Sequence, residues 1–299
     1  MKGLRFVSGD EALRTEDGLR IRKNVIMTVR RQFKGRMLFK SLPPALGVGV
    51  SVFGYDTLSE VSDASLDYAW PGPENKDIIN LARSTVAIPN LHKEAEINKI
   101  DLRASMDGGQ PLNITNILSQ AYKVAMLENA IIIDGYSRDG TTYEIQGLYQ
   151  AAGNDYAVAS NWGVPANIIT SINGAIALML ASNYQHPFNL TLNSTQWVEL
   201  QPLIGSTSKS YFEWVIKALN GPNNEGGGRG KIRIDASIVA GTALMSVVDN
   251  EGQFDYIRAE DYTTYLKILE KTENLFARVY VRGLPIVYNA VSLCKLSNI

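Results

Sequence analysis

The sequence contains little of the chemistry on which most enzyme sites depend. Its 299 residues include a single cysteine, Cys294, and only two histidines, His92 and His186. One cysteine excludes an intrachain disulfide and a four-cysteine metal site, and two histidines cannot supply a zinc cluster. We therefore predict no metal and no cofactor. Cys294 lies in an apolar strand pattern, which predicts a small buried side chain.

Long apolar runs are absent as well. The most apolar stretch, "NGAIALMLA" at residues 173–181, is too short to span a membrane and belongs to a longer amphipathic pattern. The first residues, "MKGLRFVSGDEALR", contain no apolar export region. These features predict a protein that stays in the cytoplasm without a membrane partner.

Net charge is nearly absent, but the charges are unevenly distributed. The formal net charge is −1, whereas residues 1–40 contain eleven Lys and Arg against four Asp and Glu. Such an asymmetry is typical of an arm that meets an anionic partner. A solvated helix face that pairs with acidic neighbours explains it equally well, and the sequence leaves both open.

The glycine-rich stretch "NNEGGGRGKI" at residues 223–232 resembles a phosphate-binding loop only superficially. The P-loop spacing would place its first glycine at Glu225, and Ile232 stands where a hydroxyl side chain should follow Lys231. The following "KIRID" reads as a strand, whereas phosphate loops open a helix. This stretch is therefore predicted to be a solvated surface loop.

No catalytic residue can be assigned. No Gly-x-Ser-x-Gly elbow surrounds a serine, and His186 follows a predicted helix end, where capping is its expected role. Glu94 and Glu96 alternate on a polar strand, which predicts a solvated sheet face and not an enclosed acid–base pair.

Periodicity predicts a mixture of helices and strands. We expect helices over residues 15–34, 113–131, 167–184 and 210–219, and a short helix that Ser194 caps. The first helix would bury a stripe of Leu19, Ile26, Val29 and Phe33. Strands are predicted where Val48, Val50 and Val52 alternate, throughout the extended residues 88–105, and over the segments "PFNLTLN", "KIRID", "ALMSVV", "FDYIRA", "LFARVYV" and "NAVSLCKL".

A polar, proline-bearing excursion occupies residues 56–90. A structureless loop of this length is unusual inside a compact domain, so we expect an arm or hairpin that reaches away from the body. Trp70 would then contact another surface, although a core position remains open.

Several pieces in order resemble the encapsulin family, whose shells share the tailed-phage major capsid fold. They are "FKGRMLF" after the first helix, the excursion with the strand that returns from it, and the helix "ITNILSQAYKVAMLENAIIIDG" with Glu128, Asp134 and the turn at Gly147 and Leu148. The segments "FNLTLNSTQWVELQPL" and "GGGRGKIRID" complete the series. The resemblance covers about residues 15–299 as an ordered series of weak motifs.

The resemblance implies an α+β fold. Its parts would be residues 1–44 as N-terminal arm and helix, 45–90 as extended loop, 91–164 with 258–290 as peripheral domain with a long spine helix, and 165–257 with 291–299 as axial domain. The chain would assemble with copies of itself into an icosahedral shell, without enzymatic activity. It would enclose ferritin-like cargo for iron storage, or peroxidases.

The resemblance also implies three kinds of site. Cargo would dock through a C-terminal peptide at Val29, Phe33, Arg36 and Phe39, for which core packing is the alternative. Gly205, Ser206, Thr207, Ser208 and Lys209 would line a pore that admits small molecules, and Trp70, Pro71 and Pro73 would contact neighbouring subunits.

Two other hypotheses remain. A viral or proviral major capsid protein would use the basic first 40 residues toward packaged nucleic acid, and Lys76 would be a candidate crosslink donor. A soluble nucleotide-binding or sugar enzyme would use the glycine-rich loop and form a small oligomer.

Overall fold

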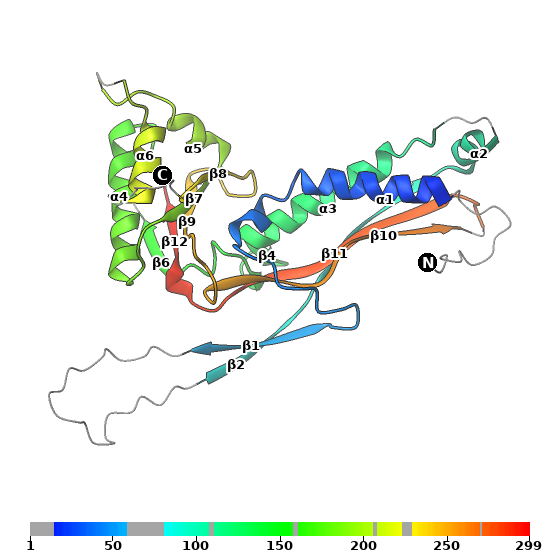
Figure 1. Cartoon of the computed structure of the whole chain (residues 1–299), viewed down its shortest axis with the longest axis horizontal. Coiled ribbons are helices and arrows are strands. Elements are labelled where there is room, and N and C mark those ends of the chain that lie inside the picture. Colours follow the sequence, from blue (N-terminus) through cyan, green and yellow to red (C-terminus); the bar gives the residue numbers. More distant parts are fainter. Residues whose placement is uncertain are drawn as a thin grey trace.

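The chain folds into an elongated molecule with a compact block at one end, as Figure 1 shows for the computed structural model. The structure describes residues 15–58, 81–107, 111–157, 161–205, 208–222, 229–269 and 271–299. The helices are α1 (Thr15–Arg30), α2 (Lys99–Asp107), α3 (Thr115–Ile133), α4 (Pro165–Ala181), α5 (Ser194–Glu199) and α6 (Tyr211–Asn220), with short 3-10 turns at Gly35–Leu38 and Ala290–Ser292. The strands are β1 (Val52–Leu58), β2 (Leu81–Ala87), β3 (Asn90–Ile97), β4 (Gly135–Ser137), β5 (Tyr143–Gln146), β6 (Asn154–Ala157), β7 (Phe188–Leu192), β8 (Ile232–Ile234), β9 (Thr242–Val247), β10 (Phe254–Ile268), β11 (Leu275–Val287) and β12 (Leu293–Ser297).

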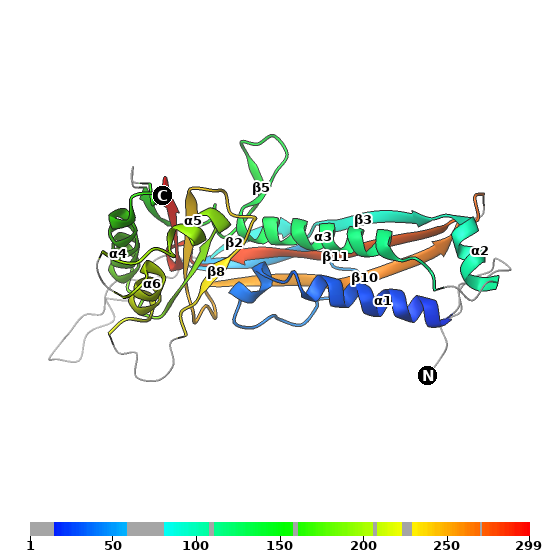
Figure 2. The same ribbon diagram turned by 90° about the horizontal axis from the view of Figure 1, so that it is seen from above.

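The elongated part is a long antiparallel sheet in the order β10-β11-β3. Residues of β11 alternate between buried and half-buried over most of its length, as expected for a strand with one face against a core. α3 and α1 run along this sheet, as seen from above in Figure 2. Ile21, Val25 and Val29 of α1 pack in one core with Ala121 and Ala125 of α3.

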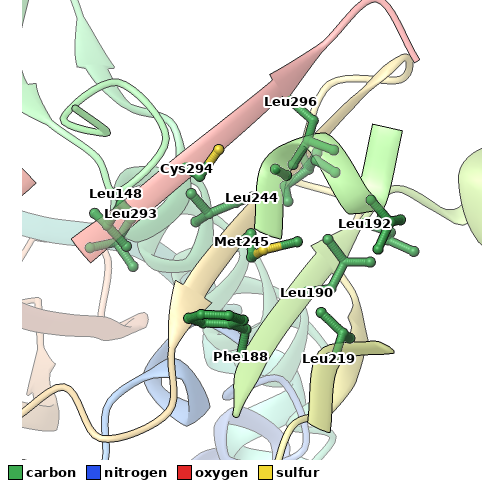
Figure 3. Packing of buried hydrophobic residues seen from close by; sticks show 14 of the residues in the cluster. Leu148, Phe188, Leu190, Leu192, Leu219, Leu244, Met245, Leu293, Cys294 and Leu296 are labelled. Atoms are coloured by element: carbon green, nitrogen blue, oxygen red, sulfur yellow. The ribbon is translucent and has the colours of Figure 1, made fainter. Parts of the chain in front are cut away.

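The compact block is built on a five-stranded sheet in the order β6-β12-β9-β7-β8. Every residue of β7 is buried, including the polar Asn189 and Thr191, which alternate with Phe188, Leu190 and Leu192. Figure 3 shows how Phe188, Leu190 and Leu192 of this strand lie among side chains from β9 and β12. Cys294 of β12 belongs to the same core and is fully buried, which confirms its prediction as a buried residue.

The predicted arm leaves the body as a hairpin. β1 and β2 pair antiparallel from Val52 opposite Ala87 to Leu58 opposite Leu81, and Figure 1 shows this ribbon pointing away from the body. The strand predicted from Val48 onward was wrong in its start, because Val48 lies in an irregular segment and is 67% exposed. The Arg282 side chain of β11 donates hydrogen bonds to the carbonyls of Val48 and Val50. These carbonyls are therefore satisfied by a side chain and not by a neighbouring strand.

The extended segment predicted through residue 105 was also wrong in its second half. β3 ends at Ile97 and α2 begins at Lys99. The side chain of Asn98 accepts a hydrogen bond from the backbone N–H of Ile100 at 3.0 Å, which satisfies a donor in the first helical turn. Alternating apolar and charged residues do not distinguish a strand from a short helix. Here the cap formed by Asn98 favours the helix.

The other predicted helices and strands are present with shifted ends. The helix predicted over 113–131 is α3, and the side chain of Asn113 just before it accepts a hydrogen bond from Thr115 N–H. The cap of α5 is Asn193 and not Ser194, because the Asn193 side chain accepts from Thr195 N–H. The ring of His186 lies 3.2 Å from the carbonyl oxygen of Leu219, near the end of α6.

Candidate functional site

A buried ionic cluster joins the segment after α1 to the body of the molecule. Arg36, in the 3-10 turn, is 4% exposed, and its guanidinium lies 2.8 Å from the Glu128 carboxylate of α3. A second guanidinium nitrogen lies 2.9 Å from the carboxylate of Asp261 in β10. One arginine therefore links three elements that are far apart in the sequence.

Two tyrosines and a phenylalanine complete the cluster. Tyr256 and Tyr262 donate hydrogen bonds to the two carboxylate oxygens of Glu128. The ring of Phe33 lies beneath the guanidinium of Arg36, 4.4 Å from its central carbon. Because Glu128 receives donors on both oxygens, its burial is compensated by hydrogen bonds as well as by charge.

The electrostatics of the cluster keep its protons in place. Burial alone would lower the pKa of Arg36, but the charge and hydrogen bonds of Glu128 outweigh it and raise that pKa well above its usual value. Burial, followed by the charge of Glu128, raises the pKa values of Tyr256 and Tyr262. Arg36 thus stays charged and both tyrosines stay neutral donors near neutral pH. The arrangement is a structural clamp, without a proton donor or acceptor poised near neutrality.

The predicted cargo-docking residues lie around this clamp, but most of them point inward. Phe33, Arg36 and Phe39 come together, with Phe33 stacked on Arg36 and the Phe39 ring 5.8 Å from that of Tyr256. Val29 lies apart in the core between α1 and α3. Val29, Arg36 and Phe39 are buried, whereas Phe33 is half-buried. In this conformation only Phe33 of the four offers surface to a partner.

The outward face of α1 combines apolar and cationic side chains. Leu19, Ile26 and Met27 are exposed, and Lys23 and Arg30 lie between and beside them at helical spacing. The buried stripe predicted for this helix was therefore half wrong, because Leu19 and Ile26 face outward. The buried stripe consists of Ile21, Val25 and Val29, which are four residues apart. This regular spacing is visible in the sequence and would have predicted the buried face.

The basic charge of the N-terminal region is only partly paired. Lys40 lies 3.2 Å from Asp249 and 3.4 Å from Glu251. Lys23, Arg30, Arg31 and Lys34 are exposed and form no ion pair with any residue that the structure describes. Pairing with acidic neighbours thus accounts for Lys40 but not for these four residues.

The predicted pore segment connects α5 to α6 as a narrow projection. Leu203 and Ser210 form an isolated bridge, and Ile204 N–H donates to the Lys209 carbonyl at 2.9 Å. Gly205, Ser208 and Lys209 are exposed, whereas Ser206 and Thr207 lie outside the described residues. Gly205 has a φ of +53°, a left-handed value that glycine adopts without strain.

The predicted intersubunit contacts lie outside the described residues. These are Trp70, Pro71 and Pro73, together with Lys76. Next to the base of the arm, an open groove of about 280 Å³ separates the hairpin from β5 and the end of β11. Tyr55, Val86 and Ile286 line it, with Glu144 as its one carboxylate.

The described residues contain no group of three or more His, Cys, Asp or Glu side chains arranged to hold a metal ion. None of the helices in the described part of the chain is both long and apolar enough to cross a membrane.

The sequence matches a known protein family. The family described as "Encapsulating protein for peroxidase" (Linocin_M18) matches residues 12–222. A curated relative, the diheme-cytochrome-encapsulin shell fusion protein of Kuenenia stuttgartiensis, is 25% identical over 215 residues, which are 72% of this chain and 57% of that protein. The chain thus spans little more than half the length of this relative.

The fold is similar to those of several solved particles. The virus-like particle from Pyrococcus furiosus aligns with a TM-score of 0.68 at 14% identity, over 96% of this chain and all of that one. The capsid of Myoviridae phage XM1 aligns with a TM-score of 0.63 at 10% identity, over 86% and 89% of the two chains. The capsid of an empty GTA particle gives 0.60 at 12% identity, over 99% and 94%. At these identities the likeness shows the fold alone, and it confirms the predicted α+β fold of tailed-phage major capsid proteins.

Proposed function

This chain belongs to the family of encapsulating proteins for peroxidase, and from that premise we propose that it is a shell subunit that self-assembles into an icosahedral compartment around cargo enzymes. The observation that carries the proposal is the family match over residues 12–222, which covers α1, α3 and α4, the arm, and the part of the compact block up to α6. The capsid fold supports it, because that fold is found in closed particles such as the one from Pyrococcus furiosus.

The cargo is a peroxidase or a ferritin-like protein, held through a short C-terminal peptide. The docking site consists of the outward face of α1 with Ile26, Met27 and the exposed edge of Phe33. Lys23 and Arg30 add positive charge at its border. The buried Arg36 supports this surface from beneath, because its guanidinium packs on the ring of Phe33.

Small molecules enter through pores, and the subunit itself carries out no reaction. The projection between Leu203 and Ser210 lines such a pore with Gly205, Ser208 and Lys209, together with Ser206 and Thr207. Exposed hydroxyl side chains and one lysine would give a polar, mildly cationic opening. The arm, with Trp70, Pro71 and Pro73, overlaps a neighbouring subunit, and the shell assembles in the cytoplasm.

A capsid that packages DNA is the second candidate, because phage capsids share this fold at TM-scores close to that of the Pyrococcus furiosus particle. The exposed Lys23, Arg30, Arg31 and Lys34 would then face nucleic acid. The family match favours the cargo shell over this alternative.

An enzyme that uses the glycine-rich loop has less support. The segment after the loop is the strand β8, whereas a phosphate loop would open a helix. Residues 223–228 of the loop lie outside the described residues.

The size of the purified particles and the molecules enclosed in them distinguish these functions. We expect size-exclusion chromatography and electron microscopy to show uniform hollow particles in the megadalton range. Mass spectrometry should identify a co-purifying peroxidase or ferritin-like protein. Nuclease-resistant genomic DNA inside the particles would favour the capsid, and a small oligomer would contradict both.

The docking site is tested by a matched pair of substitutions. Ile26→Asp places a charge on the outward face of α1 and should reduce cargo loading at least tenfold while particles still form. Ile100→Asp makes the same change at an exposed position of α2 and should leave loading unchanged. Normal loading of the Ile26→Asp particles would remove this site.

A further inference from the structure

Two charged side chains of the compact block have no partner in the described part of the chain. Arg233 lies in β8, and its Nε is buried without a hydrogen-bond acceptor. Glu199 ends α5, and its Oε2 is buried without a donor. Both residues are half-buried and neither forms an ion pair with the residues that the structure describes.

Each of these side chains is in an environment that disfavours its charged form. Burial lowers the pKa of Arg233 and raises the pKa of Glu199. No neighbouring charge offsets the burial at either position, in contrast to Arg36, where Glu128 does so. A buried charge is stable when it is paired, and neither residue has a counter-charge among the described residues of one subunit.

Arg233 lies at an open edge of the sheet. β8 is the last strand in the order β6-β12-β9-β7-β8 and pairs with β7 on one side only. Arg233 is opposite Thr191, so its side chain lies on the other face of the sheet from the fully buried Leu190 and Leu192. In the described part of the chain this edge has no second strand partner.

Exposed apolar side chains accompany the two unpaired charges. Val198 precedes Glu199 and is 65% exposed, and Leu203, just beyond α5, is 59% exposed. Val239 follows β8 and is 61% exposed. The neighbouring Ile238 carbonyl accepts a hydrogen bond from the Asn193 side chain, which fixes this segment against the start of α5. Large exposed apolar side chains beside unsatisfied polar groups are typical of a surface that another protein covers.

We propose that Arg233 of one subunit forms an ion pair with Glu199 of a second copy of this chain, across a contact to which Val198, Leu203 and Val239 contribute. The two charges are complementary, and they do not meet within one subunit. The contact is heterologous, because a strand edge on one copy meets the end of α5 on the next, and such contacts form a ring when the rotation from copy to copy closes. The proposal rests on the shell assembly proposed above.

A disulfide crosslink tests the pairing directly. The double substitution Arg233→Cys with Glu199→Cys should give dimers and larger multimers on a non-reducing gel after mild oxidation of assembled particles. Reducing agent should return them to monomer. The two single-cysteine variants are the controls, since the native Cys294 is buried and unavailable. Particles of normal size that give no multimers would overturn the pairing.

Charge reversal gives an independent test. Arg233→Glu and Glu199→Arg should each lower the yield of particles at least tenfold, and the double reversal should restore most of it. Arg229→Glu, at a side chain that is 70% exposed, is the matched control and should assemble normally. Circular dichroism checks that each variant folds, and the crosslink decides if one does not. Normal assembly of Arg233→Glu, or no recovery in the double variant, contradicts the pairing. Wild-type protein that stays dispersed would instead contradict the shell function.

Discussion

The residue Arg36 shows how a buried charge is accommodated in this fold. It lies between two carboxylates, and one of these, Glu128, also accepts hydrogen bonds from two tyrosines. Arg233 is buried to a lesser degree and has none of these partners among the described residues. A buried guanidinium thus stabilises the fold at Arg36 and, in our proposal, forms a contact between subunits at Arg233.

Removal of the Arg36 charge should destabilise the subunit strongly. Arg36→Met leaves Glu128 buried with tyrosine donors but without a cation, which costs roughly 3–5 kcal/mol for a buried pair that loses one partner. Urea denaturation of the unassembled subunit measures the free energy of unfolding. Arg278→Met, which removes an exposed pair with Glu94, is the control and should cost far less. Equal losses of unfolding free energy in Arg36→Met and Arg278→Met would show that the clamp contributes little to stability.

Asp261 should contribute to the acid sensitivity of the subunit. Burial alone would raise the pKa of its carboxyl, but Arg36, the Tyr262 backbone N–H and Arg258 together outweigh burial, and the pKa in the folded state is lowered. A lowered pKa in the folded state stabilises the protein above the unfolded value of about 4, and this contribution is lost as the pH falls through the folded value. Asp261→Asn should therefore be less stable than wild type at pH 7, and the difference should shrink toward pH 2. Unfolding titrations at several pH values measure it, and a difference independent of pH would contradict the assignment.

At the scale of elements, α1 shows why an amphipathic pattern can be oriented incorrectly. Its apolar residues form two overlapping stripes, one with Leu19 and Ile26 and one with Ile21, Val25 and Val29. The second is buried because it faces Ala121 and Ala125 of α3, whose small side chains let the two helices approach closely. The sequence of α1 alone contains no information about this partner.

The entry to β8 depends on a glycine for steric reasons. A Cβ atom on Gly230 would lie 2.5 Å from the carbonyl oxygen of Phe188, and Gly230 N–H donates to Asn220 at 2.9 Å. Gly230→Ala should therefore cost about 1–3 kcal/mol, because the backbone of β7 must shift. Gly49→Ala is the control, since a Cβ at that position meets nothing within 4 Å. Urea denaturation measures the free energy of unfolding of both variants. Equal values would show that β7 shifts away from a Cβ at residue 230 without cost.

At the scale of the whole molecule, the surfaces that we propose for contact with other proteins lie outside three separate apolar cores. The three apolar clusters lie within the sheets and their helices, and Phe53 and Tyr55 at the base of the arm are partly buried against one of them. Outside these cores, the described part of the chain exposes the ribbon, the outward face of α1 and the β8 edge. In the shell that we propose, these parts contact other proteins.

Deletion of the arm should separate folding from assembly. We expect that replacing residues 59–80 by Asn-Gly, a two-residue turn suited to an antiparallel hairpin, leaves the subunit folded, because Leu58 and Leu81 already face each other. Particles should fail to form, which size-exclusion chromatography detects. Trp70→Ala in the full-length chain tests the arm with a smaller change. Normal particles from the deletion variant would contradict a role of the arm in assembly.

Local patterns in the sequence determined most helices and strands, the buried Cys294 and the position of the arm, because periodicity and turn residues act over a few neighbours. The ordered motifs also predicted the capsid fold, which the comparisons confirmed. The tertiary structure alone decided that Arg36 and Phe39 face inward, that Leu19 and Ile26 face outward, and that Arg233 and Glu199 have no partner among the described residues. Burial and charge pairing depend on residues distant in the chain, such as Glu128 and Asp261 around Arg36, and only the packed fold brings these together.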